Sequence, residues 1–146
     1  MDEKDERILD VLKENSKLST QQISKKTFIP ITTVHHRIKK LEKDGVIKKY
    51  TVVLDNKKID KAISAYVLIN VDYKLLKQIK KTQYELAKKL KLNPAIEEVS
   101  VITGETDTII KVWVKDIDEL NKLIEGYLRN LDGVDRTRTL VVLSEV

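Results

Sequence analysis

Hydrophobic residues recur at helical spacing near the start of the chain, which predicts a first helix over residues 5–15. A second short helix is predicted to begin at Ser19, because Ser19 and Gln22 have the S-x-x-Q spacing of a capping box. It ends near Thr27. Pro30 interrupts the pattern, since proline lacks a backbone donor and disfavours a helical residue before it. These residues therefore predict two short helices followed by a tight turn.

A third amphipathic helix is predicted over residues 31–44, ending at Gly45, a residue suited to the left-handed position after a helix. Its apolar stripe, which we expect in the core, consists of Ile31, Val34, Ile38 and Leu41. The opposite face is polar and cationic. Short helices, a tight turn and such a helix predict a helix-turn-helix, which lays its second helix in the major groove of DNA.

After Gly45 the pattern changes to that of strands. Residues 46–49 and 50–54 are rich in β-branched side chains and are followed by Asp55 and Asn56, so we expect a β-hairpin. The hairpin serves either as a wing that contacts the flanking DNA backbone or only as a cap on the small core.

The second half of the chain alternates between strand and helix patterns. The expected elements are a strand over 63–71, a helix over 75–90 with Ile79 buried, strands over 96–103 and 106–114, a helix opening at Asp116 with Ile117 on its buried stripe, and a strand over 134–143. This order is that of a ferredoxin-like βαββαβ sandwich, so the fold class is α+β. The expected domains are a winged helix-turn-helix (1–54), a linker (55–62) and a ferredoxin-like domain (63–146).

One face of the predicted sheet has no helix to cover it. Alternation directs one set of side chains to the helices: Ala65, Val67, Ile69, Ile110, Val112 and Val114. It leaves another set on the open face: Tyr66, Leu68, Ile109 and Trp113. An apolar patch of this kind is typical of an interface, and we expect a homodimer through it. The alternative is packing against the N-terminal domain. A two-fold dimer would present two helix-turn-helix units to successive half-sites.

Composition narrows the class of function. The 146 residues contain no cysteine and four dispersed glycines, which excludes disulfides, thiolate zinc sites and glycine-rich phosphate loops. His35 and His36 are adjacent and cannot chelate one ion as an i, i+4 pair can. We therefore expect a binding protein, with no catalytic residue, metal site or cofactor. An acidic N-terminus and the lack of a long apolar run favour the cytoplasm.

The net charge of +5 is unevenly distributed. Residues 1–16 carry −3, residues 17–49 carry +7, and residues 50–146 carry +1. The basic block covers the predicted turn, recognition helix and hairpin, as expected of a surface that neutralises phosphates. The candidates for contacts with base edges are Thr32, Thr33, His36 and Arg37, and Arg37 also suits a phosphate. The candidates for phosphate contacts are Lys25, Lys26, Lys39, Lys40, Lys48 and Lys49. Seven further lysines over residues 74–91 form either a solvated face or a second nucleic-acid surface.

Two blocks resemble the Lrp/AsnC, or feast/famine, transcription regulators of bacteria and archaea. The first is TTVHHRIKKLEKDGVI over residues 32–47, with Tyr50, and the second combines Gly104-Glu105-Thr106-Asp107 with the TRT of residues 137–139. There are departures: Ser24 and Phe28 stand where such turns often carry Ala and Gly, and Glu105 stands where the family has Asp.

The resemblance implies a C-terminal domain of the family's RAM type that binds a small effector, often an amino acid, between dimers. The effector-binding candidates are Gly104, Glu105, Thr106 and Asp107, and the alternative for this loop is a structural β-turn. The chain is expected to be a sequence-specific regulator that binds double-stranded promoter DNA as a dimer or a higher oligomer. The alternatives are an architectural protein that coats DNA with little specificity and, with less support, a small enzyme.

Overall fold

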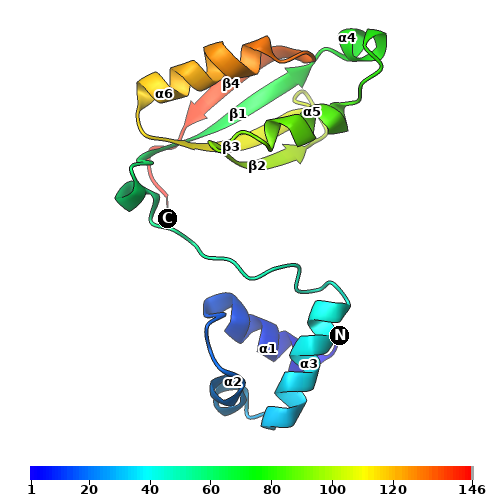
Figure 1. Ribbon diagram of the computed structural model, residues 1–146, viewed down its shortest axis with the longest axis vertical. Coiled ribbons are helices and arrows are strands. Elements are labelled where there is room, and N and C mark those ends of the chain that lie inside the picture. The colour runs from blue at the N-terminus through cyan, green and yellow to red at the C-terminus, as the bar shows by residue number, and fades with distance from the viewer. Residues whose placement is uncertain (146) are drawn as a thin grey trace. The chain divides into compact units, whose positions relative to one another are not determined.

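The computed structural model describes residues 1–145. The chain forms two compact units, one over Met1–Val53 and one that begins at Leu54 (Figure 1). The first unit is helical, and the second is built on a four-stranded sheet. The fold class expected from the sequence, α+β, is confirmed.

The first unit consists of α1 (Glu3–Glu14), α2 (Thr20–Thr27) and α3 (Ile31–Lys43). Capping explains where the first two begin. At α2 the predicted capping box is confirmed, because Gln22 N donates to Ser19 Oγ at 3.2 Å and Ser19 N donates to the Gln22 side chain at 2.9 Å. Asp2 and Asp5 form the corresponding box at α1. The three helices enclose a cluster of buried apolar residues: Ile8, Ile23, Ile29 and Val34.

The turn between α2 and α3 accommodates both departures from the family pattern. Phe28 lies in the left-handed region at φ 56°, the conformation for which glycine is the usual choice. The Ser24 hydroxyl donates to the Ile29 carbonyl at 2.5 Å and closes the turn, a bond that alanine cannot make. The expected core position of Ile31 is wrong: its side chain is half exposed, because the first turn of α3 extends beyond the small core.

The expected β-hairpin over residues 46–54 is also absent. These residues form bends and extended chain without strand pairing, and the following segment holds a short 3-10 helix, Asn56–Ile59. Val53 is fully exposed. β-branched residues favour a strand only where a neighbouring strand and a packed face are available, and residues 46–54 find neither within their own unit.

The second unit contains β1 (Ile63–Val71), β2 (Ile96–Val101), β3 (Thr108–Val114) and β4 (Val134–Val141). All pairings are antiparallel, in the order β2-β3-β1-β4. The helices α5 (Gln83–Leu90) and α6 (Ile117–Asn121) lie along the same face of the sheet (Figure 1). The expected inward-facing residues of β1 and β3 are buried and belong to a cluster of fifteen, as predicted.

The helix expected over residues 75–90 is broken in two. A short α4 (Tyr73–Gln78) ends before Lys80, which has a left-handed φ of 54°. Thr82 then caps α5 with a capping box, in which Thr82 N donates to Glu85 at 2.7 Å. Apolar residues continue at helical spacing across the break, so the sequence predicts one helix even though Thr82 and Glu85 have the T-x-x-E spacing of a capping box. Ile79, which was expected in the core, lies at the break and is 36% exposed.

The last helix departs from regular α geometry. α6 continues as a π-helical segment, Lys122–Tyr127, and a 3-10 turn, Leu128–Asn130. Leu120, Leu123 and Leu128 are buried along this helix. Ile117, predicted on the buried stripe, lies in the first turn of α6 and is 56% exposed.

Candidate DNA interface

Helix α3 carries six of the ten predicted DNA contacts. Four of the six are exposed, namely Thr32, His36, Lys39 and Lys40, and the other two, Thr33 and Arg37, are half-buried at the flank of the helix. Lys25 and Lys26 are exposed in the last turn of α2, directly before the turn that leads into α3. The whole cationic block, residues 17–49, thus lies within the first unit.

Arg37 is tied to the start of α1. Its Nη1 lies 2.6 Å from Asp2 Oδ1 and 2.8 Å from Asp5 Oδ1. These hydrogen bonds lower the pKa of both carboxyl groups below their ordinary value and raise the pKa of Arg37. Arg37 therefore braces α3 against α1, and its charge is compensated within the unit. The sequence did not predict this pairing because the partners lie more than thirty residues away, although Asp5 stands at the start of the first predicted helix.

A hollow of about 450 Å³ opens beside this ion pair. Its lining consists of Met1, Asp2, Asp5, Thr33, His36, Arg37 and Lys40. Three of the four base-edge candidates thus share one surface. The two carboxylates in this hollow are paired with Arg37, which reduces the repulsion that DNA phosphates would meet there.

The segment after α3 is held to that helix at two points. Ile47 N donates to the Leu41 carbonyl at 3.1 Å, and the Tyr50 hydroxyl donates to Glu42 Oε1 at 2.7 Å. Burial, with the bond to Glu42, raises the pKa of Tyr50 to about 12. Lys48 and Lys49 lie between these two anchors and are exposed. They therefore stay close to the C-terminal end of α3 even though the expected hairpin does not form.

The loop of residues 104–107 is closed by bonds within the second unit. Asp107 Oδ2 accepts from Val71 N at 2.8 Å, and its Oδ1 accepts from the Tyr73 hydroxyl at 2.9 Å, a bond that raises the pKa of Tyr73. Asn70 donates to the Glu105 carbonyl at 2.6 Å. Both oxygens of Asp107 are thus engaged by the chain itself, whereas Gly104 and the Glu105 side chain are exposed.

The open face of the sheet is less apolar than expected. Lys111 lies on it, with its Nζ 5.7 Å from the Tyr66 ring centre and 5.3 Å from that of Trp113. Glu145 pairs with Lys111 at 3.0 Å and raises its pKa, and the Trp113 indole donates to Glu97 at 2.6 Å. Strand alternation places Lys111 on the same face as Ile109 and Trp113, so a positive charge on this face could have been predicted from the sequence. Leu68 and Ile109, the other two predicted members, are half-buried.

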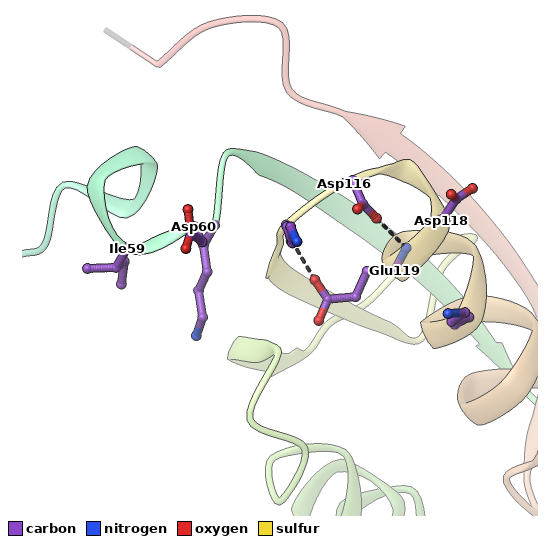
Figure 2. A pocket seen from close by; sticks show the side chains of 8 residues that line it. Ile59, Asp60, Asp116, Asp118 and Glu119 are labelled. Carbon is purple, nitrogen blue, oxygen red and sulfur yellow. Dashed lines mark hydrogen bonds between the residues drawn. The ribbon is translucent and has the colours of Figure 1, made fainter.

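A second hollow lies between the 3-10 helix and the start of α6 (Figure 2). Its acidic side chains serve as caps: Asp116 accepts from Glu119 N at 2.8 Å, and Glu119 accepts from Lys115 N at 2.5 Å. Asp60 and Asp118 also line it, together with three lysines. Among residues 1–145, no cluster of His, Asp and Glu side chains has the arrangement of a metal site.

A helix-turn-helix with an exposed cationic helix, followed by a separate ferredoxin-like sandwich, defines the class of two-domain DNA-binding regulators. Comparison of the chain with known protein families supports this class. Residues 1–48 match the description winged helix-turn-helix DNA-binding, and residues 64–146 match the Lrp/AsnC ligand binding domain. The chain belongs to the Lrp/AsnC family of transcription regulators.

Several relatives align over nearly the whole chain. An HTH-type transcriptional regulator of Pyrococcus horikoshii is 36% identical over 141 residues, covering 97% of this chain and 91% of the relative. The regulator FL11 of Pyrococcus furiosus is 35% identical over 144 residues, covering 98% and 89%.

Solved structures share the fold. A transcriptional regulator of Neisseria meningitidis, solved as a complex with L-Met, superposes with a TM-score of 0.90 at 23% identity, covering 100% of this chain and 92% of that one. LrpC of Bacillus subtilis gives 0.85 at 25% identity, covering 100% and 96%. Over residues 1–145, no helix has the length and hydrophobicity needed to cross a membrane.

Proposed function

We propose that this regulator recognises specific sequences in double-stranded promoter DNA as a homodimer, within the cytoplasm and without catalytic turnover. The observation that carries the proposal is the exposed face of α3, on which two hydrogen-bonding side chains, Thr32 and His36, lie among lysines. A helix of this kind can present its N-terminal residues to base edges in the major groove. The proposed boundaries are a DNA-binding domain over 1–54, a linker over 55–62 and a sensing domain over 63–146.

The proposed contacts fall into two classes. Thr32, Thr33 and His36 contact base edges, since they lie toward the N-terminal half of α3 and carry donors and acceptors. Phosphate contacts come from the exposed lysines of α2, α3 and the segment after α3: Lys25, Lys26, Lys39, Lys40, Lys48 and Lys49. Phosphate contacts supply affinity that depends on salt and carries little sequence information.

Arg37 has two proposed roles, which one variant separates. If Arg37 reads a base, Arg37→Ala weakens specific binding by roughly 1 to 3 kcal/mol and relaxes the preference at one position. If it only braces α3, the variant lowers the stability of the first unit while the ratio of specific to random affinity stays constant. The bonds to Asp2 and Asp5 favour the bracing role. Asp5→Asn is the matched control, because it breaks part of the brace and leaves the guanidinium in place.

We propose that dimers form through the open sheet face. Tyr66, Leu68, Ile109 and Trp113 supply its apolar part, and Lys111 contributes a charge that is already paired. Trp113→Asp should split the dimer in sedimentation, because it places an unpaired carboxylate in the interface. Tyr84→Asp, an exposed aromatic position on α5, is the control and should leave the mass unchanged. A Trp113→Asp protein that keeps the wild-type mass would rule out this face.

We further propose that an amino acid, or a molecule of that class, binds near residues 104–107. The support is the match to a ligand-binding domain and a structural neighbour solved with L-Met. Gly104, Glu105 and Thr106 are the residues available to it, while Asp107 shapes the loop through its bonds to Val71 and Tyr73. Calorimetry with individual amino acids on the wild-type and Glu105→Gln proteins tests this. Silence with every amino acid would favour the structural-turn alternative.

Selection of bound sequences from random DNA tests the central proposal. A regulator should enrich a discrete motif, with two half-sites about one helical turn or a multiple of it apart if the dimer binds both. An architectural protein would return no motif, and footprinting on the protein's own promoter region would show continuous protection. Thr32→Ala and His36→Ala should change the motif, whereas Lys48→Ala should weaken binding uniformly.

A further inference from the structure

Phe28 stands out on the surface of the first unit. It occupies the turn between α2 and α3, and its side chain is 91% exposed. Its backbone is left-handed at φ 56°, a conformation that glycine adopts at lower cost than phenylalanine. Neither packing nor backbone preference therefore accounts for a phenylalanine at this position, and nothing in the core of the unit requires its ring.

The local structure holds this ring outward. Ile29, the next residue, is 2% exposed and packs into the core of the unit. The Ser24 hydroxyl fixes the Ile29 carbonyl from the preceding helix at 2.5 Å. The turn is thus anchored directly after Phe28, and the Phe28 ring is left in solvent.

The surroundings of Phe28 match a nucleic-acid surface. Lys25 and Lys26 precede it in the last turn of α2, and both are exposed. Ile31 and Thr32 follow it in the first turn of α3, and Ile31 is 48% exposed. Phe28 and Ile31 are therefore two exposed apolar side chains at the N-terminal end of α3. Along the chain they lie between the two lysines proposed to contact phosphates and Thr32, which is proposed to contact a base edge.

We infer that Phe28 is a specificity-determining residue that packs against the 5-methyl group of thymine where the N-terminal end of α3 enters the major groove. The thymine methyl is the apolar feature among the base edges of that groove, and apolar side chains recognise it by contact. The inference rests on the proposed DNA recognition by α3 and adds a preference for thymine over cytosine at one position of each half-site.

The test compares variants at Phe28 on the sequence that the wild-type protein selects. Phe28→Gly removes the ring and relieves the left-handed strain, so its melting temperature should rise while its affinity for the selected sequence falls about fivefold or more, the range of one good base contact. Phe28→Asn also suits the left-handed backbone and should behave like the glycine variant. Phe28→Leu keeps an apolar side chain and should retain more of the affinity.

A second arm replaces the thymines of the site one at a time by uracil, which removes only the methyl group. At the contacted position this substitution should weaken wild-type binding severalfold and have no effect on Phe28→Gly. Lys80→Gly is the control, because Lys80 has a φ of 54° in the second unit. It should gain stability in the same way, and its binding should keep the full sensitivity to uracil.

Two results would overturn the inference: unchanged specific affinity in Phe28→Gly, or uracil effects equal in the wild-type and glycine proteins at every position. The outcome is separable from that of the proposed function. A wild-type protein that prefers the selected sequence over random DNA supports recognition by the first unit whatever Phe28 does. A wild-type protein without that preference removes the proposed function itself.

Discussion

The first unit is held together by a few buried side chains and several polar ties, whereas the second is held by a continuous sheet. Four residues form the buried cluster of the first unit and fifteen form that of the second. The first unit supplements its core with capping boxes, the Arg37 ion pairs and the Tyr50–Glu42 bond. In the second unit, β1 pairs along its length with both β3 and β4.

This difference follows from size and bears on function. A small unit buries a smaller fraction of its surface and is stabilised less by its core. The DNA-binding unit must also leave one helix face free for its ligand, so it cannot bury that face to gain stability. Local polar contacts that leave the face exposed are the alternative. The sheet unit has no such constraint on the side covered by helices.

Matched core substitutions should reveal the difference most strongly. Ile23→Ala in the first unit and Ile110→Ala in the second each remove a buried isoleucine side chain and should cost about 2 to 5 kcal/mol. In the first unit this cost should unfold the helices and abolish DNA binding while Trp113 fluorescence, which reports on the second unit, persists. Urea titration followed by circular dichroism and fluorescence checks it. Simultaneous loss of both signals would show that the units unfold together.

Two glycines of the second unit differ in how much space surrounds them. Gly133 has a φ of +99°, and a Cβ placed there would lie 2.5 Å from Leu76 Cδ2. Gly133→Ala should therefore cost about 3 kcal/mol from strain and overpacking together. Gly104 has a φ of +113° with no atom within 4 Å of such a Cβ, so Gly104→Ala should cost only about 1 kcal/mol from strain. Equal shifts in unfolding midpoint would contradict the role assigned to Leu76.

Helix caps test whether local ties matter more in the first unit. Ser19→Ala and Thr82→Ala remove equivalent capping hydrogen bonds from α2 and α5, and each should cost about 1 kcal/mol. The Ser19 variant should lower the first unit's urea midpoint by the larger fraction. A larger fractional loss from Thr82→Ala would reverse the comparison.

The smallest expected effect is a pH dependence confined to the first unit. The bonds to Arg37 hold the pKa values of Asp2 and Asp5 below 3.8 in the folded protein. Their contribution is therefore fully present above about pH 4 and is lost as the pH falls through the lowered values. The helical unfolding midpoint should drop over that acidic range, less steeply in Asp5→Asn. Identical acid profiles for the two proteins would show that the ion pair contributes nothing.

Local signals in the sequence determined much of the fold. The bounds of β1, the capping box at Ser19 and the buried face of β3 are all as predicted, because each depends on residues within one turn or one strand. The same is true of the gathering of lysines around α3. Strict alternation and capping chemistry are encoded at spacings of two to four residues, so neighbouring residues suffice to specify them.

Only the tertiary structure decided which groups meet across the chain. It pairs Arg37 with acids at the N-terminus, engages both oxygens of Asp107 with Val71 and Tyr73, and brings Lys111 of β3 over the Tyr66 ring of β1. It also leaves residues 46–54 unpaired despite their strand-like composition. Ion pairs between distant segments and strand pairing both depend on which residues the folded backbone brings close together in space. The local spacing of apolar residues does not specify which distant residues these are.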